Sequence, residues 1–108
     1  MSKYNSERTT IGGETFDSRK EAERWVVLRA KEERGEISDL RRQVKYVLIP
    51  AQYKDGKCIF RSVTYIADFV YEQDGEKVVE DVKGFRTPEY IIKRKLMYQI
   101  FGIYVMET

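Results

Sequence analysis

The stretch Val78-Val79-Glu80-Asp81-Val82-Lys83-Gly84 is typical of a buried strand that ends in charged residues. Side chains on a strand alternate between its two faces, so Asp81 and Lys83 share one face with Val79. A carboxylate and an ammonium group at the end of an apolar strand are costly to bury unless they are paired or used. The pattern fits either an ion pair at the end of a strand or a functional site.

A second apolar stretch, Tyr65-Ile66-Ala67-Asp68-Phe69-Val70-Tyr71, predicts a neighbouring strand with Asp68 as its single carboxylate. Asp74-Gly75 stands between the two stretches, and this dipeptide favours a tight hairpin turn. Two adjacent strands would then each deliver one aspartate, and the second would add Lys83 two residues later. This arrangement favours a shared site over an isolated ion pair.

Length and composition predict one soluble globular domain over residues 1–108, because 42% of the 108 residues are hydrophobic and 35% are charged. No apolar run approaches the roughly 20 residues of a membrane span, and the first residues have no apolar signal core. A single cysteine, Cys58, cannot form an intrachain disulfide. We therefore expect a cytoplasmic protein without a membrane partner.

The chain contains no histidine, which excludes Ser-His-Asp and Cys-His nucleophiles, nucleases with a histidine base, and zinc sites built from Cys and His clusters. Any metal must be held by oxygen ligands, which favours Mg²⁺ or Mn²⁺. The net charge of +2 says little about nucleic acid. Its distribution says more, since Lys83, Arg86, Lys93, Arg94 and Lys95 follow the central motif with Glu89 as the only acid among them.

Local signals predict a first helix that follows an N-terminal arm or hairpin over residues 1–16. Ser18 and Glu21 form a capping-box pattern, the helix runs to about Arg34, and Gly35 ends it. Its expected apolar stripe comprises Ala22, Trp25, Val26 and Ala30. Glu21 fits three roles, namely a cap, a solvated acid of the first turn, and a metal ligand aimed at the sheet; spacing alone favours the cap.

The rest of the chain predicts three antiparallel strands, a second helix and a last strand. The strands are expected at 41–50, from Lys57 through Val63 to Tyr71, and at 77–83. Arg41, Arg42 and Lys45 are expected to be solvated. The second helix should run from Pro88 to about Phe101 and bury Ile92, Leu96 and Ile100. The last strand, 103–106, should lie parallel to the Asp81 strand. The fold class is therefore α/β, a mixed sheet flanked by two helices.

Glu21, Asp68 and Asp81-Val82-Lys83, in this order, resemble the PD-(D/E)xK nuclease superfamily and its restriction-endonuclease-like core. Phe16-Asp17-Ser18, Tyr65–Phe69 and Glu80–Gly84 are similar to a small phage and prophage family of endonucleases or Holliday-junction-resolvase-like proteins, over nearly the whole chain. Ala67 stands where the superfamily's name has proline, which affects no ligand. Glu80 points to the strand face opposite to that of Asp81, so we expect Glu80 to lie outside the metal site.

The resemblance implies a metal-dependent DNA endonuclease. Glu21, Asp68, Asp81 and the main-chain carbonyl of Val82 would hold Mg²⁺ or Mn²⁺, and Lys83 would position water and offset charge. The expected DNA contacts are Arg86, Tyr90, Lys93, Arg94 and Lys95, although a solvated helix face fits the same residues. The expected partners are branched or duplex DNA and a second copy of the chain. Two alternatives stay open: an inactive nucleic-acid-binding module, and a structural protein with an Asp81–Lys83 salt bridge.

Overall fold

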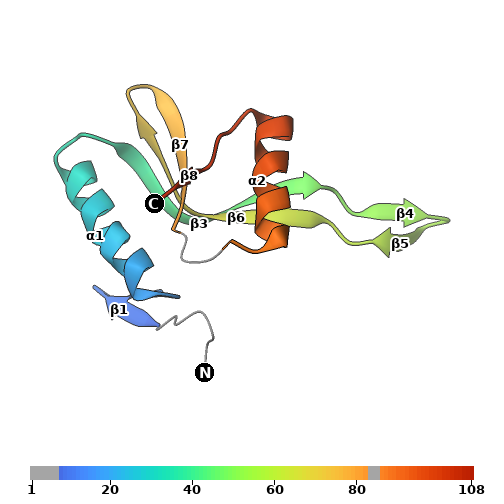
Figure 1. Ribbon diagram of the computed structural model, residues 1–108, viewed down its shortest axis with the longest axis horizontal. Coiled ribbons are helices and arrows are strands. Elements are labelled where there is room, and N and C mark those ends of the chain that lie inside the picture. The colour runs from blue at the N-terminus through green and yellow to red at the C-terminus, as the bar shows by residue number, and fades with distance from the viewer. Residues whose placement is uncertain (1–7, 83–85) are drawn as a thin grey trace.

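The computed structural model describes residues 8–82 and 86–108 (Figure 1). Lys83 of the central motif lies outside this part of the chain. The elements in chain order are β1 (Thr9–Ile11), β2 (Glu14–Phe16), α1 (Arg19–Glu33), β3 (Ser38–Ile49), β4 (Gln52–Lys54), β5 (Lys57–Phe60), β6 (Val63–Gln73), β7 (Glu76–Asp81), α2 (Pro88–Phe101) and β8 (Met106–Glu107).

A four-stranded sheet in the order β3-β6-β7-β8 forms the centre of the molecule (Figure 1). β3, β6 and β7 pair antiparallel, and β8 pairs parallel with β7, with Asp81 opposite Glu107. The adjacent β6 residues Phe69 and Val70 point to opposite faces, and each face packs against one helix. Phe69 lies in a cluster with Leu28 of α1, and Val70 in a cluster with Met97 of α2. The predicted α/β class, a mixed sheet flanked by two helices, is confirmed.

The helix α1 begins and ends where the sequence predicts. Ser18 is its N-cap and accepts a hydrogen bond from the backbone N–H of Glu21 at 3.1 Å, and Gly35 follows the last turn with φ +78°. The predicted apolar stripe is wrong at Val26, which is 49% exposed, whereas Leu28 is fully buried. The reason is that Trp25 stacks on Phe69, with ring centroids 6.1 Å apart, and this contact turns the next residue outward.

The helix α2 has the predicted bounds but buries a different face. Tyr90 and Met97, two turns apart, are buried, whereas Ile92 is 58% exposed and Ile100 is 45% exposed. Of the three predicted residues, Leu96 packs partly buried against the core. Contacts to the C-terminal segment explain the rotation, because Tyr90 donates to Glu107 and Arg94 donates to the carbonyl of Val105. Neither α1 nor α2, the helices of the described chain, is long and apolar enough to cross a membrane.

Three strand boundaries differ from the prediction. The strand expected from Lys57 to Tyr71 is interrupted at Arg61-Ser62, so β4 and β5 form a separate two-stranded sheet that projects beyond β3 and β6 (Figure 1). β3 begins at Ser38, earlier than predicted, because Ser38 already pairs with Glu72 near the end of β6. The last strand is confined to Met106–Glu107. These two residues pair with Glu80 and Asp81, the last two residues of β7.

A buried ion pair fastens α1 to the sheet. Glu80 is fully buried, and Arg24 donates from Nε and Nη2 to its two carboxylate oxygens, each at 2.8 Å. The hydroxyl of Tyr71 also donates to Glu80. Burial raises the pKa of Glu80, but the hydrogen bonds from Arg24 and Tyr71 hold this pKa below its usual range. Glu80 therefore stays ionised on the α1 face.

Arg24→Met is expected to lower the free energy of unfolding by about 3–5 kcal/mol, because it leaves the Glu80 carboxylate buried without its cation. Urea unfolding at neutral pH measures the loss. The double variant Arg24→Met/Glu80→Met should recover most of it, since no buried charge then remains. Arg19→Met breaks the exposed Arg19–Glu23 pair of the same helix and is the matched control, which should change stability little. Equal losses in the two arginine variants would contradict this account.

Candidate active site

Adjacent strands bring Asp68 and Asp81 side by side, as the sequence predicts. The register that pairs Phe69 with Glu80 places Asp68 opposite Asp81. The backbone N–H of Val82 donates to Oδ2 of Asp68 at 2.8 Å, which ties the end of β7 to β6. Asp81 is 3% exposed, and Tyr65 donates its hydroxyl proton to Oδ2 of Asp81. Both aspartates are thus fixed by hydrogen bonds within the sheet.

Glu21 faces the sheet and is linked to Asp68 through Gln43. Glu21 is 5% exposed, which excludes the role of a solvated acid. The side-chain amide of Gln43 donates both to Oε1 of Glu21, at 3.0 Å, and to Oδ1 of Asp68, at 3.2 Å. Gln43 has a left-handed backbone with φ +53°, a conformation that L side chains rarely adopt. The Glu21 backbone is capped by Ser18, while its carboxylate points toward the aspartates.

Arg42 connects the N-terminal hairpin to the site, so the expectation that it is solvated is wrong. Its side chain is 17% exposed and lies over the ring of Phe16, with 3.9 Å between the guanidinium carbon and the ring centroid. Nη1 donates to Glu14 at 2.8 Å, and Nη2 lies 3.7 Å from Oε1 of Glu21. The hairpin β1–β2, whose Phe16 is fully buried, thus holds a cation beside Glu21. Lys45, in contrast, is exposed as predicted.

The carboxylates of the site repel one another in a partly buried setting. Burial and the charge of Asp81 raise the pKa of Asp68 from 3.8 to about 7, against the lowering effect of the Val82 N–H. Burial and the charge of Asp17 raise the pKa of Glu21, and Arg42 opposes this shift. Burial and the hydrogen bond to Asp81 raise the pKa of Tyr65, so its hydroxyl remains a donor. The site therefore holds a proton near neutral pH that a cation would displace.

Asp68 and Asp81 open into a surface pocket of about 330 Å³. Its other wall is the first turn of α2, where Thr87 caps the helix. Lys93 also lines the pocket, with Nζ 2.8 Å from Oε1 of Glu89. The full lining is Thr64, Tyr65, Ile66, Asp68, Asp81, Thr87, Glu89, Tyr90 and Lys93. A ligand in this pocket would meet two carboxylates on one side and an ammonium group on the other.

Three of the predicted DNA contacts bind Glu107 of β8, although the side chain of Arg86 stays 61% exposed. Arg86 donates from Nε to Oε2 of Glu107 at 3.0 Å, Tyr90 donates to the same oxygen at 2.9 Å, and Nη1 of Arg94 lies 3.4 Å from Oε1. Arg86 and Tyr90 hold the pKa of Glu107 below its usual range. These side chains brace α2 against the C-terminal strand. Lys93 lines the pocket, and Lys95 is exposed.

Sequence reasoning missed the hydrogen-bond donors of the site, Gln43, Tyr65 and Arg42. A glutamine or tyrosine in a strand carries no local signal for such a role, because only the strand register brings it to the aspartates. Within residues 8–82 and 86–108, no group of three or more Asp, Glu or Cys side chains lies close enough to hold a metal ion. Gln43 stands between Glu21 and Asp68 in this arrangement.

The model of a protein family, DUF1064, described as a protein of unknown function, matches residues 1–105. The chain belongs to the DUF1064 family. Searches of curated proteins and of solved structures found no match. The family description names no activity, so the chemistry of this DUF1064 protein must come from its own residues.

Asp68 in the metal-free DUF1064 protein is expected to titrate near pH 7, as measured by the carboxyl ¹³C shift of Asp68. In Asp81→Asn its pKa should fall, because one neighbouring charge is removed, yet stay above 3.8 because burial remains. The same shift predicts that the free energy of unfolding declines as pH rises from about 4 to about 7, since the folded state holds the proton that the unfolded state has lost. An Asp68 that titrates near pH 4 would contradict both expectations.

Proposed function

We propose that this DUF1064 protein is a metal-dependent DNA endonuclease that hydrolyses phosphodiester bonds at a site of Glu21, Asp68, Asp81 and Lys83. The observation that carries the proposal is the pair Asp68–Asp81, held side by side at the floor of an open pocket with a proton retained near neutral pH. Such a pair destabilises the metal-free fold. A perturbed carboxylate pair in a pocket is characteristic of functional sites.

The donor type of the site fits a hard divalent cation, although the Gln43 amide separates Glu21 from Asp68 in the described arrangement. The donors are carboxylate oxygens of Asp68, Asp81 and Glu21, with the Val82 carbonyl as a further proposed ligand, and Mg²⁺ and Mn²⁺ prefer such oxygens. A bound ion of this class supplies Lewis-acid charge and lowers the pKa of a coordinated water. Gln43 holds Glu21 and Asp68 near each other with two N–H···O bonds, which offset part of their repulsion while no cation is bound.

The remaining roles are assigned to lysines. Lys83 follows Asp81 by two positions and is proposed to orient the attacking water and offset charge on the phosphate. Lys93, at the opposite side of the pocket, and Lys95 on the exposed side of α2 are proposed to contact the DNA backbone. We place Arg86, Tyr90 and Arg94 in support of these residues through Glu107.

The biological setting is proposed from the sequence resemblance. It comprises a cytoplasmic enzyme of phage or prophage DNA metabolism, with branched DNA as a candidate substrate, and a homodimer that presents one site to each of two strands. A symmetric pair of sites suits a junction with two-fold symmetry. Sedimentation of the protein with and without a four-way junction measures this state.

One observation favours a second candidate, a DNA-binding module without activity. The Gln43 amide donates to Glu21 and Asp68, and the acids of the described residues do not already form a group that could hold a metal. If the Gln43 amide keeps this position, it supplies hydrogen bonds to both carboxylates, and no metal ion is needed. The two candidates differ in whether Mn²⁺ or Mg²⁺ binds.

Wild-type protein with Mg²⁺ or Mn²⁺ is expected to cut end-labelled DNA, and Asp81→Asn should lower the rate by at least about 100-fold because a metal ligand is lost. Four-way junction, flap, duplex and single-stranded substrates identify the preferred structure, and EDTA should abolish cleavage. Asp74→Asn is the matched control, because Asp74 lies in the β6–β7 turn with φ +53°, where asparagine is tolerated. Binding without cleavage of any substrate would favour the inactive module.

Metal binding is expected to stabilise the wild-type fold and to release a proton from the aspartate pair. At 100 times its dissociation constant, Mn²⁺ should add about 2.7 kcal/mol to the free energy of unfolding. The apparent affinity should rise as pH increases from 6 to 8, since the proton on Asp68 competes with the ion. Calorimetry in buffers of different ionisation enthalpy counts the proton. An equal stabilisation of Asp68→Asn/Asp81→Asn would place the ion elsewhere and contradict the proposed site.

A further inference from the structure

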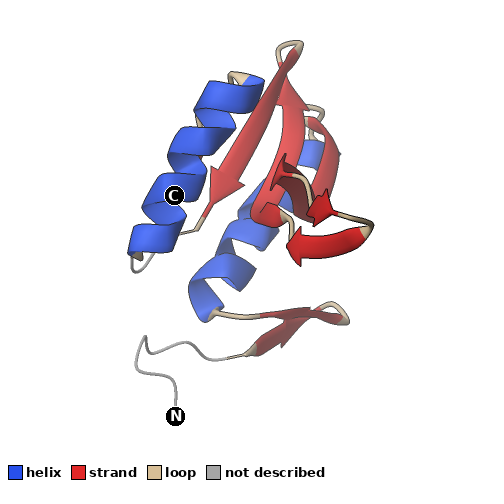
Figure 2. Cartoon of the chain, turned by 90° about the vertical axis from the view of Figure 1, so that its right-hand side faces the viewer, coloured by secondary structure: helices blue, strands red, loops and turns tan. Residues whose placement is uncertain are grey.

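The ribbon β4–β5 projects from the molecule as an arm. β3 and β6 continue beyond the central sheet into β4 and β5, which pair only with each other in the described chain (Figures 1 and 2). Every residue of both strands is exposed. A two-stranded hairpin without a covering layer is marginally stable in water. The long axis of the protein, 52 Å, reflects this projection.

The arm concentrates positive charge and aromatic rings. Its charged residues are Lys54, Lys57 and Arg61 against the single acid Asp55. Lys54 and Lys57 pair directly across the two strands beside the turn, and like charges in this position destabilise a hairpin. Tyr53 is 66% exposed and Phe60 is 60% exposed.

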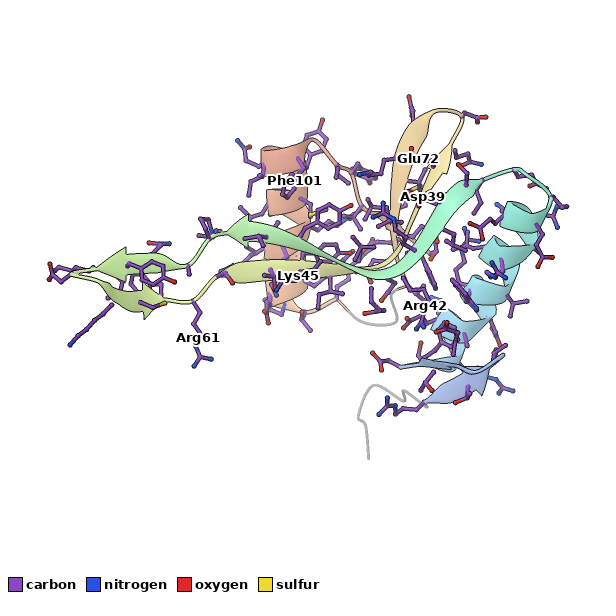
Figure 3. The ribbon with its side chains drawn as sticks, turned by 180° about the vertical axis from the view of Figure 1, so that it is seen from behind. Asp39, Arg42, Lys45, Arg61, Glu72 and Phe101 are labelled. Atoms are coloured by element: carbon purple, nitrogen blue, oxygen red, sulfur yellow. The ribbon has the colours of Figure 1, made fainter. Side chains whose placement is uncertain are left out.

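The arm is continuous with β3 and β6, and β6 carries residues that line the aspartate pocket. Lys45 of β3 pairs with Ile66 of β6, and Ile66 lines the pocket together with Asp68. Cross-strand partners share a face, so Lys45 lies on the exposed side of Ile66, opposite to the side on which Tyr65 packs against α2. Figure 3 shows Arg61 at the base of the arm, Lys45 on the ribbon, and Arg42 nearest to α1. The exposed cations Arg61 and Lys45 mark a path from the arm toward the acidic site, whereas Arg42 is mostly buried and paired with Glu14.

We propose that this path is a binding surface for double-stranded DNA, with the arm contacting the duplex at a distance from the aspartate pocket. The inference rests on the proposed nuclease function and adds the geometry of its substrate. Asp68 and Lys57 are eleven residues apart along the chain, a span of at most about 36 Å at 3.3 Å per residue. One turn of B-DNA is about 34 Å long. The arm tip would therefore contact phosphates up to about one helical turn from the pocket.

The chemistry of the arm favours DNA over a second copy of this chain. A two-fold contact between two arms would bring Lys54 and Lys57 of each copy near the same cations of the other. Phosphates relieve the Lys54–Lys57 repulsion instead. A two-stranded ribbon also has the width that a DNA groove admits, and exposed rings such as Tyr53 and Phe60 stack on or wedge between bases.

The test measures duplex binding without cleavage, in EDTA, by wild type, by the arm variant Lys57→Gln/Arg61→Gln and by a control variant. The control, Lys31→Gln/Lys77→Gln, removes two cations from the end of α1 and from the β6–β7 hairpin, away from the arm. Blunt duplexes of 8 and 24 base pairs are compared at several salt concentrations. The longer duplex spans the pocket and the arm tip, whereas the shorter one spans less than one turn.

The arm variant should bind the 24-base-pair duplex about tenfold more weakly than the control variant, with a salt slope lower by about 0.9 per lost phosphate contact. On the 8-base-pair duplex the two variants should bind alike. Equal binding of both variants to the long duplex would overturn the proposal. It would also be overturned if wild type and the control variant sediment as dimers and the arm variant sediments as a monomer, because the arm would then be a dimer contact. Failure of the wild-type protein to bind any duplex would overturn it as well. The proposed nuclease function is tested separately, by whether Mn²⁺ binds at the aspartate pair.

Discussion

The arrangement of the site depends on the ion pair between Arg24 and Glu80. Arg24 lies one turn after Glu21 on α1, and Glu80 directly precedes Asp81 on β7. The two 2.8 Å contacts between them therefore fix the helix that carries one acid of the site against the strand that carries another. A buried ion pair contributes little net stability unless its geometry and remaining hydrogen bonds are satisfied. Tyr71 supplies the further donor to Glu80. The pair thus acts chiefly by fixing position.

On the opposite face of β7, Asp81 lies beside a second acid instead of a cation. Glu80 faces a cation, whereas Asp81 faces Asp68. Three neutral donors of the described chain bind the aspartates: the Tyr65 hydroxyl, the Val82 N–H and the Gln43 amide. Neutral donors orient carboxylates without cancelling their charge, so Asp68 keeps its proton to about pH 7. One strand therefore presents an acid paired with a cation on one face and, on the other face, an acid beside a second acid. A trade between stability and function is common at active sites.

Sequence patterns were sufficient where the deciding interactions are local. Ser18 and Thr87 cap α1 and α2 as expected, and the hairpin turn at Asp74-Gly75 brings Asp68 beside Asp81. The rotation of α2 could not be predicted, because it is set by Tyr90 and Arg94 binding residues of the C-terminal segment. Gln43 was missed for the same reason: its two acceptors, Glu21 and Asp68, come from other elements. The interruption at Arg61-Ser62 also lacks a local signal, since the residues on both sides favour strands.

Anomalous diffraction from crystals of the protein soaked in Mn²⁺ tests the central claim most directly. The account predicts a peak between Asp68 and Asp81, with octahedral oxygen coordination that includes Glu21 and with the Gln43 amide no longer donating to both acids. Mn²⁺ bound elsewhere, with the Gln43 bridge intact at saturating metal, would contradict it. In that case the acids of this site would serve the fold, and the chain would bind DNA without cutting it.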